Sequence, residues 1–415
     1  MKDYLFPSII WLFLGTIQAQ DTTRISLAQL LQKVETDYPS ILQYQHNIQS
    51  IQAKADGATA WMAPTFSAGA MRFPYRLSML NEKNDPMNQA GIAFSVEQMI
   101  PNANKQKAKK SYISSLAEIE KSKREWTINE LRREAKILYY NRYATEKKQL
   151  IVRESEDILK LFISTAEEKF SNNQSQLQTI YKAKARLTEL NNMLLMLKSQ
   201  IAESNIGLNI LLVRDMNTPF EIDTLIVPRD YSIKLSDTSN ITSRSDIAAL
   251  NQYIQSMRLE QNIMKNEARP DFGIRGEHAQ MFGMPNQWTL MGMVTIPIVP
   301  WASKMYRSEI KSIGSQIQSM ELEKQTMALM AMKMQSEKLT MLAYETAQYN
   351  NYRKEIIPAY EHNLQANLLG YKQNTGDFFV LLDAWEMLLM KKMEMYEKLF
   401  IILKSEAEYE YEREI

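Results

Sequence analysis

Apolar residues recur at alternating three- and four-residue steps through several long stretches, which is typical of helices with a coiled-coil seam. The first stretch runs from Leu27 to Ala55. Two longer ones cover 103–171, which holds no Pro or Gly, and 302–372, interrupted at Gly314, Pro358 and Gly370. A helix of about 68 residues would be about 100 Å long. Each is followed by a return helix with an apolar seam. The first seam consists of Leu187, Leu190, Leu194, Leu197, Ile201, Leu208 and Leu211. The second consists of Leu382, Trp385, Leu389, Tyr396, Leu399 and Leu403, and Lys392 interrupts it.

Four short segments alternate apolar and polar residues one by one, which predicts β-strands with two different faces. They lie at about 65–75, 90–99, 271–281 and 288–297. This alternation is typical of a membrane β-barrel strand. It is equally typical of a half-exposed sheet in water, so the alternation alone does not choose between them.

The chain consists of two similar halves whose landmarks recur about 200 residues apart. Pro64 corresponds to Pro270, Pro101 corresponds to Pro300, and 170–173 corresponds to 371–374. Each half reads as a helix, a pair of strands, a very long helix and a return helix. We therefore predict a mainly α fold with a small membrane β contribution, in two tandem repeats. Repeat 1 is expected at 25–212, a mixed insert at 213–243 and repeat 2 at 244–407.

Composition excludes several function classes. The net charge is +1, there is no Cys and there are only three His, so neither nucleic acid nor thiolate chemistry is indicated. The sequence contains no nucleotide-binding loop, metal-hydrolase motif or nucleophile elbow. We expect no enzyme activity and no cofactor.

The N-terminus predicts an export signal over 1–19, with a mature chain over 20–415. Lys2 precedes a largely apolar run from Leu5 to Leu14, and Ala19 supplies the small residue at the cleavage site. This run is shorter than the roughly 20 residues that cross a bilayer, and a buried N-terminal helix is the alternative. The chain must then reach a membrane through its strands. Since four strands cannot close a barrel, three copies would be needed to supply twelve.

Three ordered motifs add a family resemblance. They are the segments Ala268 to Phe272, Glu355 to Tyr360 followed by Leu369 to Tyr371, and Gly376 to Trp385 with its Leu-Leu-Asp-Ala run. From Ile25 to about Ala407 the chain resembles the TolC family of outer-membrane efflux proteins, closest to its heavy-metal branch of CusC- and CzcC-like members.

The resemblance implies a homotrimer with a 12-stranded barrel in outer-membrane lipid, standing on an α-helical barrel in the periplasm. It further implies a passive exit duct for heavy-metal cations or drugs. The duct would work with a periplasmic adaptor, or membrane fusion protein, and an inner-membrane RND-type pump. The alternatives are a periplasmic coiled-coil adaptor or structural protein, and a type I secretion outlet.

The resemblance also implies a periplasmic gate made of carboxylates. Asp383 lies in the matching Leu-Leu-Asp-Ala segment, whereas the second acidic position of the family falls on Val380. Asp377 is a further gate candidate, with a helix cap as its alternative role. The polar turns between the long helices are candidates for adaptor docking, against a plain helix–helix turn; they comprise Asn172, Asn173, Gln174, Asn374, Thr375 and Gly376.

The strands supply the remaining candidates. Asp271, Arg275 and Glu277 share one strand face, which a barrel would turn toward the lumen. His278, Met281 and Met284 are a weak soft-metal candidate, because thioethers bind Cu(I) or Ag(I). Methionines that recur at helical spacing are candidates for a metal path for the same reason, but such methionines more often fill a core. They are Met327, Met330 and Met334, and Met387, Met390 and Met393. An interfacial aromatic girdle is expected from Phe73, Tyr75, Phe282 and Trp288.

Overall fold

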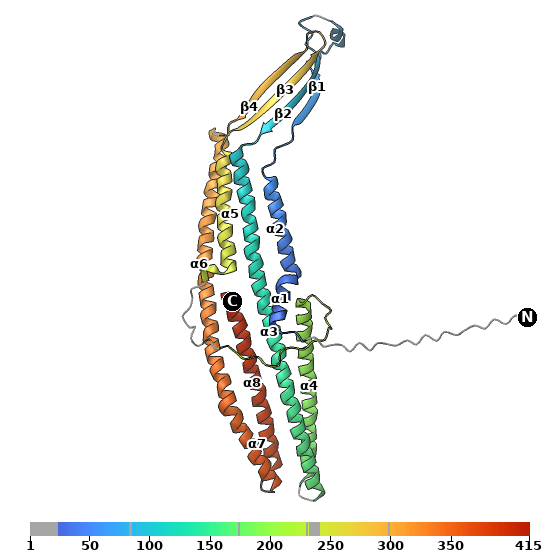
Figure 1. Cartoon of the computed structure of the whole chain (residues 1–415), viewed down its shortest axis with the longest axis vertical. Helices are drawn as coiled ribbons and strands as arrows, with labels where there is room; N and C mark the ends of the chain where they lie inside the picture. Colours follow the sequence, from blue (N-terminus) through green and yellow to red (C-terminus); the bar gives the residue numbers. More distant parts are fainter. Residues whose placement is uncertain (1–23, 83–84, 173–174, 230, 232–240, 298) are drawn as a thin grey trace, which may run out of the picture.

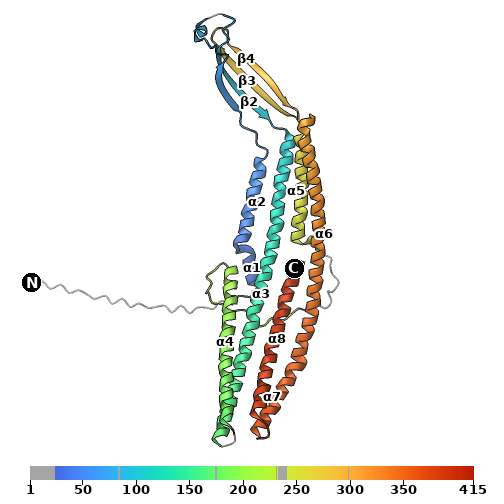
Figure 2. The same ribbon diagram turned by 180° about the vertical axis from the view of Figure 1, so that it is seen from behind.

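The molecule is elongated, with a small sheet at one end and helical hairpin tips at the other (Figures 1 and 2). The computed structural model describes residues 24–415 except 83–84, 173–174, 230, 232–240 and 298. The predicted export signal lies outside the described residues. Within the part of the chain that is described, no helix combines the length and the apolar character needed to cross a bilayer.

The two halves have the same order of elements. The first consists of α1 (Leu27–Asp37), α2 (Pro39–Gly57), β1 (Thr65–Met71), the short η1 (Leu77–Asn81), β2 (Gly91–Ile100), α3 (Ala103–Ser171) and α4 (Leu177–Leu211). The second consists of η2 (Ile241–Ser243), α5 (Ser245–Glu267), β3 (Asp271–Met281), β4 (Gln287–Thr295), α6 (Pro300–Asn351), η3 (Tyr352–Ile356), α7 (Ile357–Lys372) and α8 (Phe378–Arg413). The predicted mainly α fold with a small four-stranded contribution is confirmed.

The first predicted helix is divided in two. The apolar seam from Leu27 to Ala55 predicted one continuous helix, but the structure breaks it at Tyr38, whose backbone is extended. Pro39 follows directly and occupies the first position of α2. The prediction was wrong there because a residue before proline is pushed out of the helical region, and that steric effect outweighs the continuous seam.

The two very long helices differ in continuity. α3 runs for 69 residues without interruption. The corresponding helix of the second half contains a π-helical turn, η3, and Pro358 follows it at the start of α7. Proline has no N–H to donate to the carbonyl four residues earlier, so the backbone rearranges around it. The second hairpin therefore contains a local irregularity that the first lacks.

The sheet is antiparallel throughout, in the order β1-β2-β3-β4. β1 pairs with β2 and β3 pairs with β4 within their own halves, and β2 pairs with β3 across the repeat. The edges of β1 and β4 have no strand partner among the described residues. One face is apolar and exposed; its large residues are Phe66, Ile92, Phe94, Val96, Phe272, Ile274, Trp288, Leu290 and Val294.

Among the described residues the helices enclose two large apolar cores and two smaller apolar clusters, one around Leu339 and Tyr409 and one around Ile247 and Ala331. The lower core joins α3 and α4 to α7 and α8, and the Trp385 indole in it donates a hydrogen bond of 3.2 Å to the Ser155 carbonyl. The middle core joins α1, α3 and α8 to the insert between the halves, through Phe220 and Ile222. There the buried Tyr139 hydroxyl donates to the Ile25 carbonyl at 3.1 Å. The described part of the insert thus packs beside the helices at mid-length.

A buried carboxyl group lies near the end of α8. Glu406 accepts a hydrogen bond of 2.6 Å from the backbone N–H of Arg229, and its neighbour Glu410 forms an ion pair with Lys136. Burial raises the pKa of Glu406 to about 8, with the nearby charge of Glu410 contributing. The folded protein therefore retains a proton on this group that the unfolded chain releases above its ordinary pKa of 4.5.

We expect Glu406→Gln to stabilise the protein at pH 9 and to change little at pH 5. The stability that the protonated group contributes is fully present below pH 4.5 and is lost as pH rises through about 8. A permanently neutral amide has no proton to release, so the variant avoids this decrease in the free energy of unfolding, which is on the order of a few kcal/mol. Thermal unfolding of both proteins at the two pH values measures it. An equal difference in melting temperature at pH 5 and pH 9 would contradict the assignment.

Candidate functional site

The lower end of the molecule is formed by two helical tips, one from each repeat. In the second tip α7 ends at Lys372, and Asn374 adopts a left-handed backbone with φ of 60°. The N–H groups of Thr375 and Gly376 both donate to the Gly370 carbonyl at 3.0 Å. A Cβ at Gly376 would lie 3.0 Å from the Gly370 carbonyl carbon and the Tyr371 nitrogen. Glycine at 376 therefore permits this tight turn.

Lys169, at the end of α3, joins the first tip to the second. Its ammonium donates to the Tyr371 carbonyl and to the Asn374 side-chain oxygen. It also lies 4.4 Å from the centroid of the Tyr371 ring, which in turn packs edge-on against Phe378. The sequence analysis missed Lys169, because no periodic pattern indicates that a lysine at the end of one repeat binds the turn of the other.

We expect Lys169→Met to loosen the second tip. The variant removes charge-assisted hydrogen bonds that contribute about 2 kcal/mol. Amide exchange over 370–376 should accelerate by roughly ten- to a hundredfold, as measured by hydrogen–deuterium exchange mass spectrometry. Lys184→Met is the control, because Lys184 forms an exposed ion pair with Glu167 at 2.8 Å between α3 and α4. Equal acceleration in both variants would refute the specific role of Lys169.

The first turn of α8 gives the two candidate gate carboxylates different environments. Asp377 is the N-cap, and its carboxylate accepts a hydrogen bond of 2.6 Å from the Phe379 N–H. The helix cap that the sequence left open as an alternative is thus what the structure shows. Asp383 is exposed one and a half turns further along, while its neighbours Leu382 and Ala384 are buried.

Asp383 belongs to an exposed stripe along α8. Val380, Met387 and Met390 are also exposed, and their spacing of three, seven and ten residues places all four on one helix face. The opposite face carries Leu381 and Trp385 into the lower core. Within the described part of the chain, nothing packs on this apolar stripe with its one carboxylate near the tip. The spacing of the stripe is visible in the sequence, although the prediction covered only Asp383 and the missing acid at Val380.

The candidate docking residues lie at the two tips. Asn172 caps the end of α3 and its amide donates to the Glu168 carbonyl at 3.1 Å. Asn374, Thr375 and Gly376 form the turn before α8. The candidates Asn173 and Gln174 lie outside the described residues.

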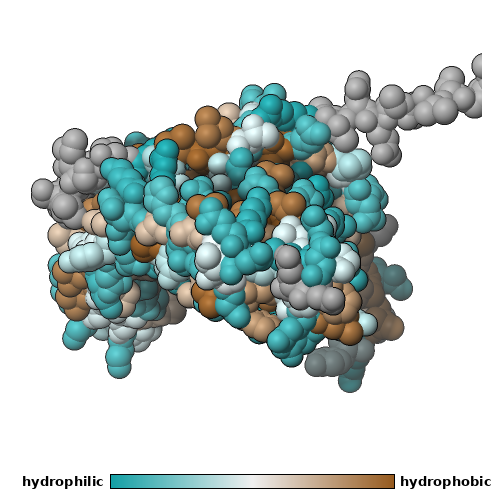
Figure 3. Space-filling model, turned by 90° about the horizontal axis from the view of Figure 1, so that it is seen from below, coloured by the Kyte–Doolittle hydropathy of each residue, from teal (hydrophilic) through white to brown (hydrophobic). Residues whose placement is uncertain are grey.

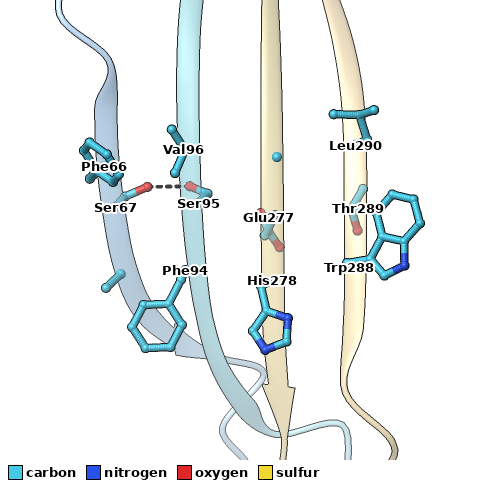
Figure 4. Close-up of a pocket in the computed structure, with 12 residues that line it drawn as sticks. Phe66, Ser67, Phe94, Ser95, Val96, Glu277, His278, Trp288, Thr289 and Leu290 are labelled. Atoms are coloured by element: carbon cyan, nitrogen blue, oxygen red, sulfur yellow. Dashed lines mark hydrogen bonds between the residues drawn. The ribbon is translucent and has the colours of Figure 1, made fainter.

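The second face of the sheet is more polar. Ser67 and Ser95 are joined by a hydrogen bond of 2.7 Å across β1 and β2 (Figure 4). Arg275 forms an ion pair of 3.1 Å with Glu277. Asp271 is on the same face by alternation but is bound by Lys105 of α3 at 2.7 Å, so it also fixes the sheet to the helices.

The candidate soft-metal cluster is not brought together. His278 is exposed on the apolar face, where it lies in register with Phe94 and Trp288 (Figure 4). Met281 is three residues further along β3 and is buried on the opposite face, and Met284 lies in the following turn. An odd separation along a strand always reverses the side, which the sequence analysis overlooked. Among the described residues no group of three His, Cys, Asp or Glu side chains is placed to hold a metal ion.

The helical methionines and the aromatic candidates are scattered. Met330, Met334, Met387 and Met390 are exposed, whereas Met327 and Met393 pack against cores. Of the four aromatic residues, Phe73 and Phe282 make an edge-on contact with ring centroids 5.8 Å apart in the loops beyond the strands, and Trp288 lies on β4. Tyr75 is exposed.

The two long edges of the molecule are apolar in places. One edge is formed by β1, α2 and α4, and the other by β4 and α6 (Figures 1 and 2). Large exposed side chains occur on both helices of the lower half, including Tyr181 and Leu195 on α4 and Leu329 and Tyr344 on α6. Seen from below, hydrophobic side chains reach the surface between hydrophilic ones (Figure 3). Both edges therefore offer surfaces without a partner within the described chain.

Solved structures share this architecture. The outer membrane protein VceC of Vibrio cholerae matches with a TM-score of 0.74 and 13% identity, over 93% of this chain and 95% of that one. CusC matches with a TM-score of 0.76 and 12% identity, over 99% and 98%. The outer membrane channel CmeC of Campylobacter jejuni matches with a TM-score of 0.74 and 13% identity, over 99% and 94%.

This chain has the fold of these outer-membrane channels. The fold that the TolC-like sequence resemblance implied is confirmed over nearly the whole chain. No family model and no curated protein matches the sequence. At 12–13% identity the likeness establishes the architecture, and the function is argued from the surfaces described above.

Proposed function

We propose that this protein is the passive outer-membrane exit duct of an efflux system. The observation that carries the proposal is the sheet, whose apolar face is exposed at the end of a long helical body. A contiguous apolar patch of this kind marks a membrane or protein interface. β2, β3 and β4 have 10, 11 and 9 residues, the length of a tilted strand that crosses hydrocarbon.

The open edges indicate the assembly. Inside a bilayer the unpaired backbone groups of β1 and β4 would each cost several kcal/mol. Pairing β4 of one copy with β1 of the next removes both edges, and the same contact brings the α6 edge against the α2 and α4 edge. Different surfaces meeting in this way close into a ring. Three copies give twelve strands and a continuous helical cylinder below them.

The lower tips act as the gate of this duct. The stripe of Val380, Asp383, Met387 and Met390 is the unpartnered face of α8 near its start. In a threefold ring the three Asp383 carboxylates attract cations and repel anions. Val380 and Met387 flank them with apolar rings, and hydrophobic constrictions close a pore by excluding water.

The tips also face the partners. The ends of α3 and α4 at Asn172 and Gln176, and the polar turn at 373–376, lie at the far end of the molecule from the sheet. A periplasmic adaptor and an inner-membrane pump dock at this end, and the pump supplies the energy. The duct itself performs no chemistry.

A deletion strain of the native host tests the function. We expect loss of tolerance to the exported compounds, restored by the intact gene. Growth on copper, silver, zinc and cobalt salts and on common drugs distinguishes metal cargo from drug cargo. Unchanged growth on every compound, together with recovery of the protein from the periplasm without detergent, would refute the proposal.

A further inference from the structure

Both long helices begin directly below the sheet (Figure 1), and basic residues are concentrated in their first turns. α3 has four lysines within its first eight residues and no acidic residue in its first turn. α6 repeats the arrangement with Lys304, Arg307 and Lys311, and also has no acidic residue in its first turn. Internal repetition thus places basic residues at the same level twice in each chain.

Helix stability does not account for these residues. The N-terminal end of a helix carries partial positive charge, so cations in the first turns are unfavourable there. Two of the lysines of α3 have structural partners: Lys105 binds Asp271 and Glu267, and Lys110 binds Asp56. The remaining cations have none within the described part of the chain. We call these five exposed residues the basic collar: Lys107 and Lys109, which lie on opposite sides of α3, and Lys304, Arg307 and Lys311 on α6.

The α6 part of the basic collar forms one continuous surface. Lys304, Arg307 and Lys311 line a shallow depression of about 370 Å³ together with Pro300, Ser303 and Ser308. The described residues that line this depression include no carboxylate, and the nearby Glu309 lies on the other side of the helix by its spacing.

Exposed tryptophans mark the same level. Trp301 is 81% exposed at the start of α6, and Trp61 is 63% exposed in the segment between α2 and β1. Tryptophan is enriched where hydrocarbon meets the polar headgroups of a bilayer. The apolar face of the sheet begins immediately beyond this level.

We propose that the basic collar binds the phosphate headgroups of anionic phospholipids in the periplasmic leaflet of the outer membrane. The inference rests on the proposed membrane insertion of the sheet. The charge is complementary, since basic residues beside a membrane-embedded segment attract anionic lipid. The basic collar sets how deeply the duct is inserted in the membrane, because the first turns of both long helices contact the periplasmic headgroup layer.

The test is a lipid competition on the purified full-length protein in reconstituted bilayers. Tryptophan fluorescence is quenched by brominated phosphatidylcholine, and unbrominated phosphatidylglycerol or phosphatidylcholine is added as competitor. We expect phosphatidylglycerol to be preferred about tenfold at low salt, with the preference lost in 1 M salt. Lys304→Gln, Arg307→Gln and Lys311→Gln combined should lower the preference severalfold, and adding Lys107→Gln and Lys109→Gln should abolish it.

The matched control removes two lysines and one arginine elsewhere. Lys198, Arg353 and Lys354 are exposed, lie in the lower helical region and form no ion pair within the described chain. Their replacement by Gln should leave the preference unchanged. A wild-type protein without preference, or an equal loss in the control, would overturn the inference.

Two other outcomes separate the inference from the proposed function. If a second copy covers the basic collar, the triple variant loses its trimer while the wild type shows no lipid preference, and the inference fails. Trp288 lies on the apolar face, so the difference in quenching by brominated lipid between the wild type and Trp288→Phe reports insertion of the sheet. Quenching of Trp288 without a lipid preference would refute only lipid binding by the basic collar. Absence of all quenching would refute the proposed membrane insertion of the sheet.

Discussion

Leu290→Arg is expected to keep the protein out of the outer membrane. Leu290 is 66% exposed on the apolar face of β4. An arginine on the lipid face of a membrane strand costs about 2–4 kcal/mol near the bilayer midplane. A ring of three chains would incur that cost three times. Fractionation should show the variant depleted from the outer membrane by at least about tenfold.

Thr289→Arg is the matched control. Thr289 is the adjacent residue of the same strand, is exposed like Leu290, and belongs to the opposite, more polar face. A lumen accommodates a charge there, so this variant should insert as the wild type does. If both variants insert as the wild type does, the apolar face does not lie in lipid, and if both fail, the assignment of the two faces to lipid and lumen is wrong.

The strands and the uninterrupted α3 were predictable from the sequence, because alternation and the absence of Pro and Gly act locally. The break at Tyr38 is also a local effect, since the ring of Pro39 pushes the preceding residue out of the helical region. Alternation likewise separates His278 from Met281, and a count of residues would have shown it. Both wrong predictions, the continuous first helix and the His278 cluster, could therefore have been avoided from the sequence.

Other features depend on contacts between distant segments. The pairing of β2 with β3 joins the two repeats, and the alternation within either strand does not indicate which strand it pairs with. Lys169 binds a turn some two hundred residues away in the chain. The spacing of the stripe around Asp383 is visible in the sequence, but its exposure depends on the packing of Leu381 and Trp385 into the lower core. The functions of Asp383 and of the docking tips stay predictions.

Asp383→Asn is expected to weaken block of the duct by a trivalent cation complex. Three carboxylates in one ring attract such an ion with several favourable charge pairs, each worth on the order of 1 kcal/mol or more at the pore. Removing them should raise the half-blocking concentration by at least about tenfold in planar bilayers. Val380→Asp adds a second ring one turn away and should lower that concentration by a similar factor.

Asp377→Asn serves as the control for the gate. Its carboxylate caps α8, and asparagine is also a good N-cap, so the tip should remain folded. Block by the trivalent cation should be unchanged. If Asp377→Asn and Asp383→Asn relieve block to the same extent, both carboxylates face the pore, and the assignment of Asp377 to capping alone is wrong.

The central claim is that the chain functions only as a closed ring of three in the outer membrane. Native mass spectrometry of the protein released from outer membranes by detergent measures this most directly. We predict a complex of three chains, each close to the full 48.2 kDa less any removed export signal. A monomer recovered from the periplasmic fraction without detergent would contradict the account.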